Sequence, residues 1–192
     1  MKTTTILMMI LLSATMISCK HANKYNDKLS YPYSKEETEQ FLDEITKNAT
    51  AYIGDITEIE RQPTDELYII TRKSLSDKEL EEYNQNSGTI YNTNDDIEDF
   101  TKNTIKDYSL VNERGEKLHV LDDGRTAYLQ EYGLWVYDNV LCQNLGINIT
   151  LDKKYEKLNG YITIEFIMPG TIFGKIKREV KIPVNITIHD EV

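Results

Sequence analysis

A run of alternating apolar and polar residues near the C-terminus constrains the fold of this chain more than any other feature. Aliphatic side chains occupy every second position of it: Val180, Ile182, Val184, Ile186 and Ile188. A period of two over this length predicts a β-strand with one buried and one solvated face, as in antiparallel sheets. Pro183 has no backbone N–H to give to a ladder, so we expect this strand at a sheet edge or at a bulge.

The same period recurs further up the chain. It covers residues 147–151 and 162–168, and Asn159-Gly160 before the second of these is a strong hairpin signal. Runs rich in β-branched and aromatic residues predict further strands at 67–71, 108–112, 117–121 and 127–137. Many short strands separated by turns favour an antiparallel β-sandwich or barrel-like domain, and so a mainly β fold class.

An α-helix is expected at the start of this domain. Ser34-Lys-Glu-Glu37 fits a capping box, in which side chains satisfy the free backbone donors of a first helical turn. An apolar stripe at helical spacing then runs from Phe41 to Ile53, and Gly54 is a natural stop. Ser76–Glu79 is a second capping box before a short helix, and residues 84–104 resemble a long surface loop with one helical turn near Ile97.

The first twenty residues have the features of a secretory signal. Lys2 gives a positive start, and the apolar stretch from Ile6 to Ile17 is shorter than the about 20 residues that a membrane-spanning helix needs. Met16-Ile17-Ser18-Cys19 resembles the lipobox of Gram-negative bacterial lipoproteins. The resemblance implies cleavage before Cys19, lipid on its sulfur and a membrane anchor through that lipid. An ordinary secreted protein cut near Ala14 or Ser18 is the alternative.

These features divide the chain into a signal peptide at 1–18, a lipidated tether at 19–33 and a single globular domain at 34–192. Removing the signal takes away one basic residue, Lys2, so 21 basic residues face 32 acidic ones and the formal charge becomes -11. Such an excess disfavours nucleic acid as a partner and permits a basic protein. In the Gram-negative lipoproteins that the signal resembles, an aspartate after the lipidated cysteine holds the protein in the inner membrane. Lys20 stands at that position here, so the resemblance implies an outer-membrane location, on the periplasmic side or at the cell surface.

No pattern in the chain identifies a catalytic residue, a metal site or a cofactor. Cys142 lies in an apolar run and is interpreted as a core thiol, and a Cys–His pair would depend on the fold. Residues 92–96 begin like a calcium loop, but Ile97 and Asn103 stand where that loop needs Gly and Glu. Asp95, Asp96, Glu98 and Asp99 are therefore interpreted as a solvated acidic loop.

An aromatic segment at 128–137 gives the one speculative ligand site. In a regular strand Trp135 and Tyr137 share a face, whereas Tyr128 and Tyr132 lie on the other unless a bulge occurs at Gly133. Trp135 and Tyr137 could then contribute to a glycan platform, although core and sheet packing is the preferred interpretation.

The function expected from the sequence is that of a lipid-anchored envelope protein with a non-catalytic binding or structural role. One alternative is an acidic, immunity-type inhibitor of a basic toxin or enzyme. A second alternative is a hydrolase whose site the sequence does not reveal.

Overall fold

The computed structural model describes residues 31–53, 63–89, 96–121, 126–170 and 174–188. Residues Pro32–Val192 form one compact unit. Its helical elements are α2 (Lys35–Asn48), α3 (Asp77–Gln85) and the short 3-10 helix η1 (Ile97–Phe100). Its strands are β1 (Thr50–Tyr52), β2 (Thr64–Ser74), β3 (Lys102–Asn112), β4 (Lys117–Leu118), β5 (Thr126–Tyr128), β6 (Gln130–Tyr137), β7 (Val140–Tyr155), β8 (Lys157–Pro169) and β9 (Lys175–Thr187).

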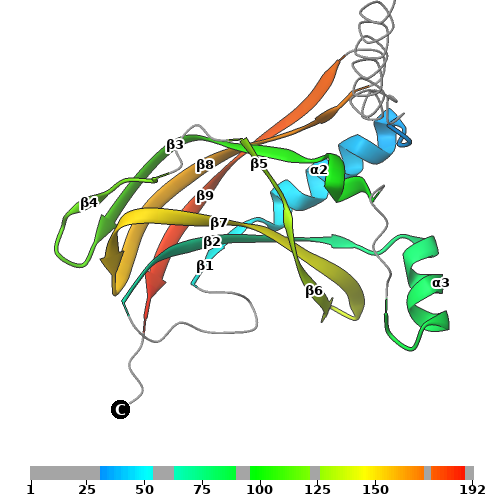
Figure 1. Cartoon of the computed structure of the whole chain (residues 1–192), viewed down its shortest axis with the longest axis horizontal. Coiled ribbons are helices and arrows are strands. Elements are labelled where there is room, and N and C mark those ends of the chain that lie inside the picture. The colour runs from blue at the N-terminus through cyan, green and yellow to red at the C-terminus, as the bar shows by residue number, and fades with distance from the viewer. Residues whose placement is uncertain (1–30, 54–62, 90–95, 122–125, 171–173, 189–192) are drawn as a thin grey trace, which may run out of the picture. The chain divides into compact units, whose positions relative to one another are not determined.

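The strands form two antiparallel sheets (Figure 1). The first sheet has the order β1-β2-β7-β6, and the second has the order β4-β3-β8-β9 with β5 also paired to β3. The sheets do not close into a barrel. The prediction of a mainly β, antiparallel fold with an N-terminal helix is confirmed, and the arrangement is consistent with a sandwich.

Between β7 and β8 the chain passes from the first sheet to the second within a single residue. Strand β7 belongs to the first sheet and β8 to the second, and only Glu156 separates them. Tyr155 is buried beside this corner and donates its hydroxyl to the Glu66 carbonyl over 2.7 Å. The Glu156 carbonyl accepts from the Ile188 amide over 2.8 Å, which fixes the end of β9 to the corner.

Helix α2 contributes to the apolar core, because it contacts both β2 and the pair β8 and β9 (Figure 1). Its capping box forms as predicted, with Ser34 and Glu37 bonded reciprocally. Phe41, Leu42 and Ile45 are buried, and each such side chain contributes roughly 1.5–3 kcal/mol to stability. The Thr71 hydroxyl donates to the Ile45 carbonyl over 2.5 Å, joining β2 to the helix.

The predicted end of this helix was wrong. It stops at Asn48, and Ala49 already has extended backbone angles. Residues 50–52 instead pair with β2, where Thr50 lies opposite Ile70 and Tyr52 opposite Tyr68. The apolar spacing that resembled a longer helical stripe is satisfied here by a strand, because pairing with a buried neighbour outweighs a weak helical preference.

The C-terminal alternation behaves as predicted. Strand β9 is the outermost strand of the second sheet, as Pro183 indicated, and Ile182, Val184 and Ile186 are buried on one face. The opposite face of β8 is less open than expected, because Thr163 is 7% exposed. Beside it the Lys181 ammonium lies 3.5 Å from the centre of the Tyr161 ring, so long side chains cover this face.

Several predicted features lie outside the described residues. They are the signal peptide, Cys19 and most of the tether, Gly54 and residues 92–95 of the calcium-like segment, including Asp95. Within the described ranges, no helix has the length and apolarity needed to cross a membrane. The helical turn near Ile97 is η1, as predicted, but residues 102–104 belong to β3 rather than to a surface loop.

Candidate ligand-binding site

The two faces of the first sheet differ in what covers them. Leu67, Ile69 and Thr71 of β2 point toward helix α2 and are buried. The alternate residues Tyr68 and Arg72 point the other way, because successive side chains of a strand lie on opposite faces. We call this second side of the first sheet the outer face.

A β-bulge brings three aromatic residues of β6 to the outer face. The register with β7 moves from Glu131–Leu145 to Gly133–Asn144 and leaves Tyr132 without an opposite residue. Gly133 adopts a φ of 103°, which is open to glycine and strained for other residues. Trp135 and Tyr137 therefore share a face, as predicted, and Tyr132 joins them.

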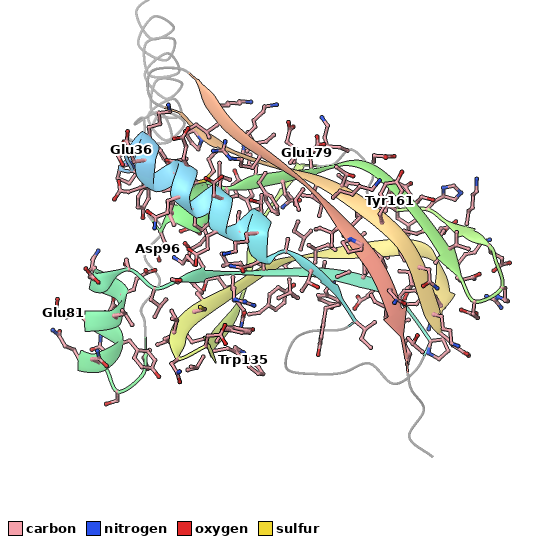
Figure 2. All side chains as sticks on the ribbon, turned by 180° about the vertical axis from the view of Figure 1, so that it is seen from behind. Glu36, Glu81, Asp96, Trp135, Tyr161 and Glu179 are labelled. Carbon is pink, nitrogen blue, oxygen red and sulfur yellow. The ribbon has the colours of Figure 1, made fainter. Side chains whose placement is uncertain are left out.

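Contacts across the sheet confirm where Tyr132 lies. Its ring meets that of Tyr68 edge to face, with centroids 6.2 Å apart. Tyr128 does not take part, because it lies on β5 and pairs with β3 in the second sheet. The preferred interpretation of the segment as core packing was wrong for Trp135, because this residue is 44% exposed. Its position on β6 is labelled in Figure 2. Core packing was expected because sequence alternation does not reveal which sheet face is covered.

A cavity of about 260 Å³ opens on the outer face, and we call it the aromatic cavity. Helix α2, strand β1 and the three strands β2, β6 and β7 all contribute to it. Its lining consists of aromatic, amide, hydroxyl, aliphatic and guanidinium groups: Asn48, Thr50, Tyr52, Ile70, Thr71, Arg72, Trp135, Tyr137 and Asn144. None of these residues is an aspartate or a glutamate.

Arg72 is held in the cavity by stacking. Its guanidinium carbon lies 3.9 Å from the centre of the Tyr137 ring, a cation–π contact that leaves the N–H edge of the group free. The Asn48 amide donates to the Arg72 backbone carbonyl over 3.3 Å, which fixes the strand beneath the side chain. Among the described residues, none gives this guanidinium an ion pair or a hydrogen bond.

Asn144 brings a second unused donor to the cavity. Its side chain is 0% exposed, and its Oδ1 accepts from the Tyr137 hydroxyl over 3.0 Å. Its Nδ2 is buried and finds no partner within the described part of the chain. A buried donor left unpaired costs about 1–3 kcal/mol, so such a group calls for an explanation in function.

A larger cavity, of about 460 Å³, lies between α2, the end of β2, α3 and η1. We call it the acidic cavity, because five carboxylate residues line it: Glu37, Glu44, Glu79, Glu82 and Asp96. Figure 2 shows Asp96 between helices α2 and α3. Lys73 and Lys78 are the basic residues of its lining.

A buried ion cluster lies beside the acidic cavity. The Lys73 ammonium is 2.6 Å from Glu98 Oε2 and 2.8 Å from Glu79 Oε1, and the Lys73 and Glu98 side chains are 5% and 3% exposed. The expectation that Glu98 belongs to a solvated loop was wrong. Lys73 continues the inward series of Leu67, Ile69 and Thr71, and a lysine in that position needs a carboxylate beside it.

Charge and burial shift the pKa values of this cluster in different directions. Burial disfavours the Lys73 ammonium, but the charges of Glu98 and Glu79 outweigh burial and raise its pKa. Burial also opposes the Glu79 carboxylate, yet Lys73 and Ser76 together lower its pKa. For Glu98 burial dominates, so its pKa is raised even beside Lys73. The cluster joins β2, α3 and η1, so we interpret its role as stabilisation of the fold.

Cys142 is buried, in agreement with its interpretation as a core thiol. Burial raises its pKa, which disfavours the reactive thiolate. His119 is exposed, and the other two histidines lie outside the described residues. Across the described ranges, no cluster of three His, Cys, Asp or Glu side chains could hold a metal ion.

Comparison of the chain with protein families, curated proteins and solved structures finds no match in any of the three.

Proposed function

We propose that this protein is a lipid-anchored binding protein of the Gram-negative envelope, and that its aromatic cavity binds carbohydrate without catalysing a reaction. The lipid would be carried on Cys19, which would hold the protein to the outer membrane on the periplasmic side or at the surface. The geometry of the described residues supports the ligand-binding part of this proposal.

The aromatic cavity carries the proposal. Trp135 and Tyr137 offer apolar ring faces with polar ends, a combination suited to a sugar ring that is apolar on its C–H face and polar at its rim. Asn48, Asn144 and Thr50 supply hydrogen-bonding groups around the rings. The volume is slightly below the about 300–1,000 Å³ of typical small-molecule sites, so it suits one sugar ring or the end of a chain.

The composition of the cavity also supports binding over catalysis. Among the described residues of its lining there is no histidine, cysteine or carboxylate that could act as nucleophile or general base. A hydrolase, the sequence-based alternative, would need such a group within reach of the ligand. The closest thiol, Cys142, is buried with a raised pKa.

The protein contains an intrinsic fluorescent probe of ligand binding to the aromatic cavity. Trp135 is the sole tryptophan of the chain and is partly exposed, so its fluorescence reports directly on the cavity. We expect emission to shift to shorter wavelength when oligosaccharides are titrated in, because the ring leaves water. Tyr137→Ala should abolish the shift and keep the reporter, whereas Tyr128→Ala, at an exposed aromatic of the second sheet, should preserve it.

A neutral and acidic oligosaccharide panel that leaves Trp135 emission unchanged, with no binding heat, would reject this proposal. Melting temperatures of both tyrosine variants would be measured first, so that loss of fold is not mistaken for loss of binding.

We propose as a second candidate that the protein is an acidic inhibitor of a basic toxin or enzyme. The five carboxylates of the acidic cavity support it, since they form a negative surface for a basic partner. The test is capture of a basic protein from envelope extract, followed by association rates at low and high salt. Charge reversal at Glu82 and Asp96 should slow association, whereas Glu179→Lys on β9 should have little effect.

A further inference from the structure

We infer that the aromatic cavity recognises the carboxylate of an acidic sugar, such as a uronate unit of a polysaccharide. This inference rests on the proposed function and names the class of its ligand. It follows from the hydrogen-bonding groups that the cavity leaves unused.

Both unused groups are donors. The Arg72 guanidinium lies over the Tyr137 ring and has no carboxylate partner among the described residues. The Asn144 Nδ2 is fully buried and unpaired within the same described part. A carboxylate carries only acceptors, and two oxygens in one plane match the fork of an arginine. A neutral sugar hydroxyl would satisfy one donor and leave the guanidinium charge uncompensated.

The charge of the aromatic cavity is positive, opposite in sign to the net charge of the protein. The chain has 32 acidic and 22 basic residues, yet the described residues that line the aromatic cavity include one cation and no acid. Seven of these lining residues are uncharged and polar or aromatic, so none of them cancels the field of Arg72 inside the cavity. An anionic ligand therefore gains attraction here that it would lose on the acidic surface around α2 and α3.

The rings and the donors are arranged for one ligand. Trp135 is exposed at the rim, while Arg72 is half-buried and Asn144 lies beneath. A sugar ring resting on Trp135 would direct its carboxylate inward to Arg72 and the Asn144 amide. Stacking on Trp135 serves any sugar, and the two donors select the acidic one.

The test compares oligosaccharide pairs that differ only in charge. Oligogalacturonate, oligoglucuronate and oligomannuronate are each titrated beside their carboxyl methyl esters, with Trp135 emission and calorimetry as readouts. We expect at least one free acid to bind about 10- to 100-fold more tightly than its ester, the range for losing a hydrogen bond to a charged group. Arg72→Gln should remove this preference, and Arg72→Lys should restore only part of it, since lysine lacks the fork.

A matched control leaves Arg72 in place and removes a cation from an aromatic ring elsewhere in the protein. Lys181→Gln removes a cation stacked on Tyr161 in the second sheet and should leave the preference unchanged. If acids and esters bind equally well and still depend on Tyr137, the inference is overturned and the proposed function stands. If neither acids nor esters bind but a neutral oligosaccharide does, the inference is overturned and the proposed function again stands. If no acid, ester or neutral oligosaccharide binds, both are overturned.

Discussion

Replacing Lys73 by methionine would measure how strongly the buried ion cluster holds β2, α3 and η1 together. Methionine keeps most of the stem volume and removes the ammonium that lies 2.6 Å from Glu98 and 2.8 Å from Glu79. Glu98 is then a carboxylate with 3% exposure, no cation beside it and an Oε1 that already lacks a partner in the described structure.

Removing one partner of a buried pair costs about 3–5 kcal/mol, because the other charge stays buried without compensation. A domain of 150–250 residues loses roughly 2–4 °C in melting temperature per kcal/mol, so we expect a fall of roughly 6–20 °C. Lys78→Met is the control, since Lys78 is exposed on α3 and the same charge is lost. That variant should change stability by less than about 0.5 kcal/mol.

The pH dependence gives a sharper test. Burial raises the pKa of Glu98, and Lys73 opposes that rise, so the variant should raise the pKa further. A carboxyl whose pKa is higher in the folded state contributes stability below its unfolded pKa and loses that contribution as pH rises through the folded value. The loss caused by Lys73→Met should therefore be larger at pH 8 than at pH 5.

Glu98→Gln in the same chain should recover much of the loss at pH 8, because no uncompensated charge then remains buried. Denaturant unfolding of the parent chain, of Lys73→Met and of the double variant at both pH values gives the free energies that are compared. A loss below about 1 kcal/mol, or one that is equal at pH 5 and pH 8, would refute the account of the cluster.

Three other predictions concern the anchor, the second sheet and the thiol. Cys19→Ala should abolish labelling by radioactive or alkyne-tagged fatty acid, and a labelled mature chain would contradict the lipid assignment. Ile186→Asp should lower the free energy of unfolding by roughly 3–5 kcal/mol, because it buries an unpaired charge. Asn185→Asp, at the exposed neighbouring position, should have little effect on thermal or denaturant unfolding. Equal losses in the two variants would rule out the register of β9. Cys142 should resist iodoacetamide in the native protein and react after denaturation, and rapid native alkylation at neutral pH would revive a catalytic role.

The second sheet was the easier part to predict. Strands β8 and β9 bury apolar residues at alternate positions, so hydrophobic alternation indicates their central parts and orientation. It missed their beginnings at Lys157 and Lys175, and the hairpin predicted at Asn159-Gly160 was wrong, because both residues pair with neighbouring strands inside β8. Both capping boxes also predicted helix starts correctly, because a cap is a local arrangement of three or four residues. Helix ends were harder, since α2 stops where tertiary pairing with β2 begins.

The candidate sites depend on buried polar residues, which hydrophobic patterns do not detect. Gln143 and Asn144 interrupt the apolar run of β7, so only its part from Ile147 was recognised as a strand. Lys73 was within reach of the sequence: extending the alternation of β2 by two residues places it on the buried face. Its partner Glu98 is 25 residues away and could come only from the fold.

The bulge in β6 has a consequence for finding related proteins. Outward side chains of a regular strand are separated by even numbers of residues, but Tyr132 and Trp135 are three apart, with Gly133 between them. Deleting one residue there would turn part of the aromatic set toward the interior, whatever the residue's identity. Relatives that keep the site should therefore conserve the spacing of this motif, which is two aromatic residues an odd number of positions apart with a glycine between them. The spacing should persist even where the surrounding sequence has diverged.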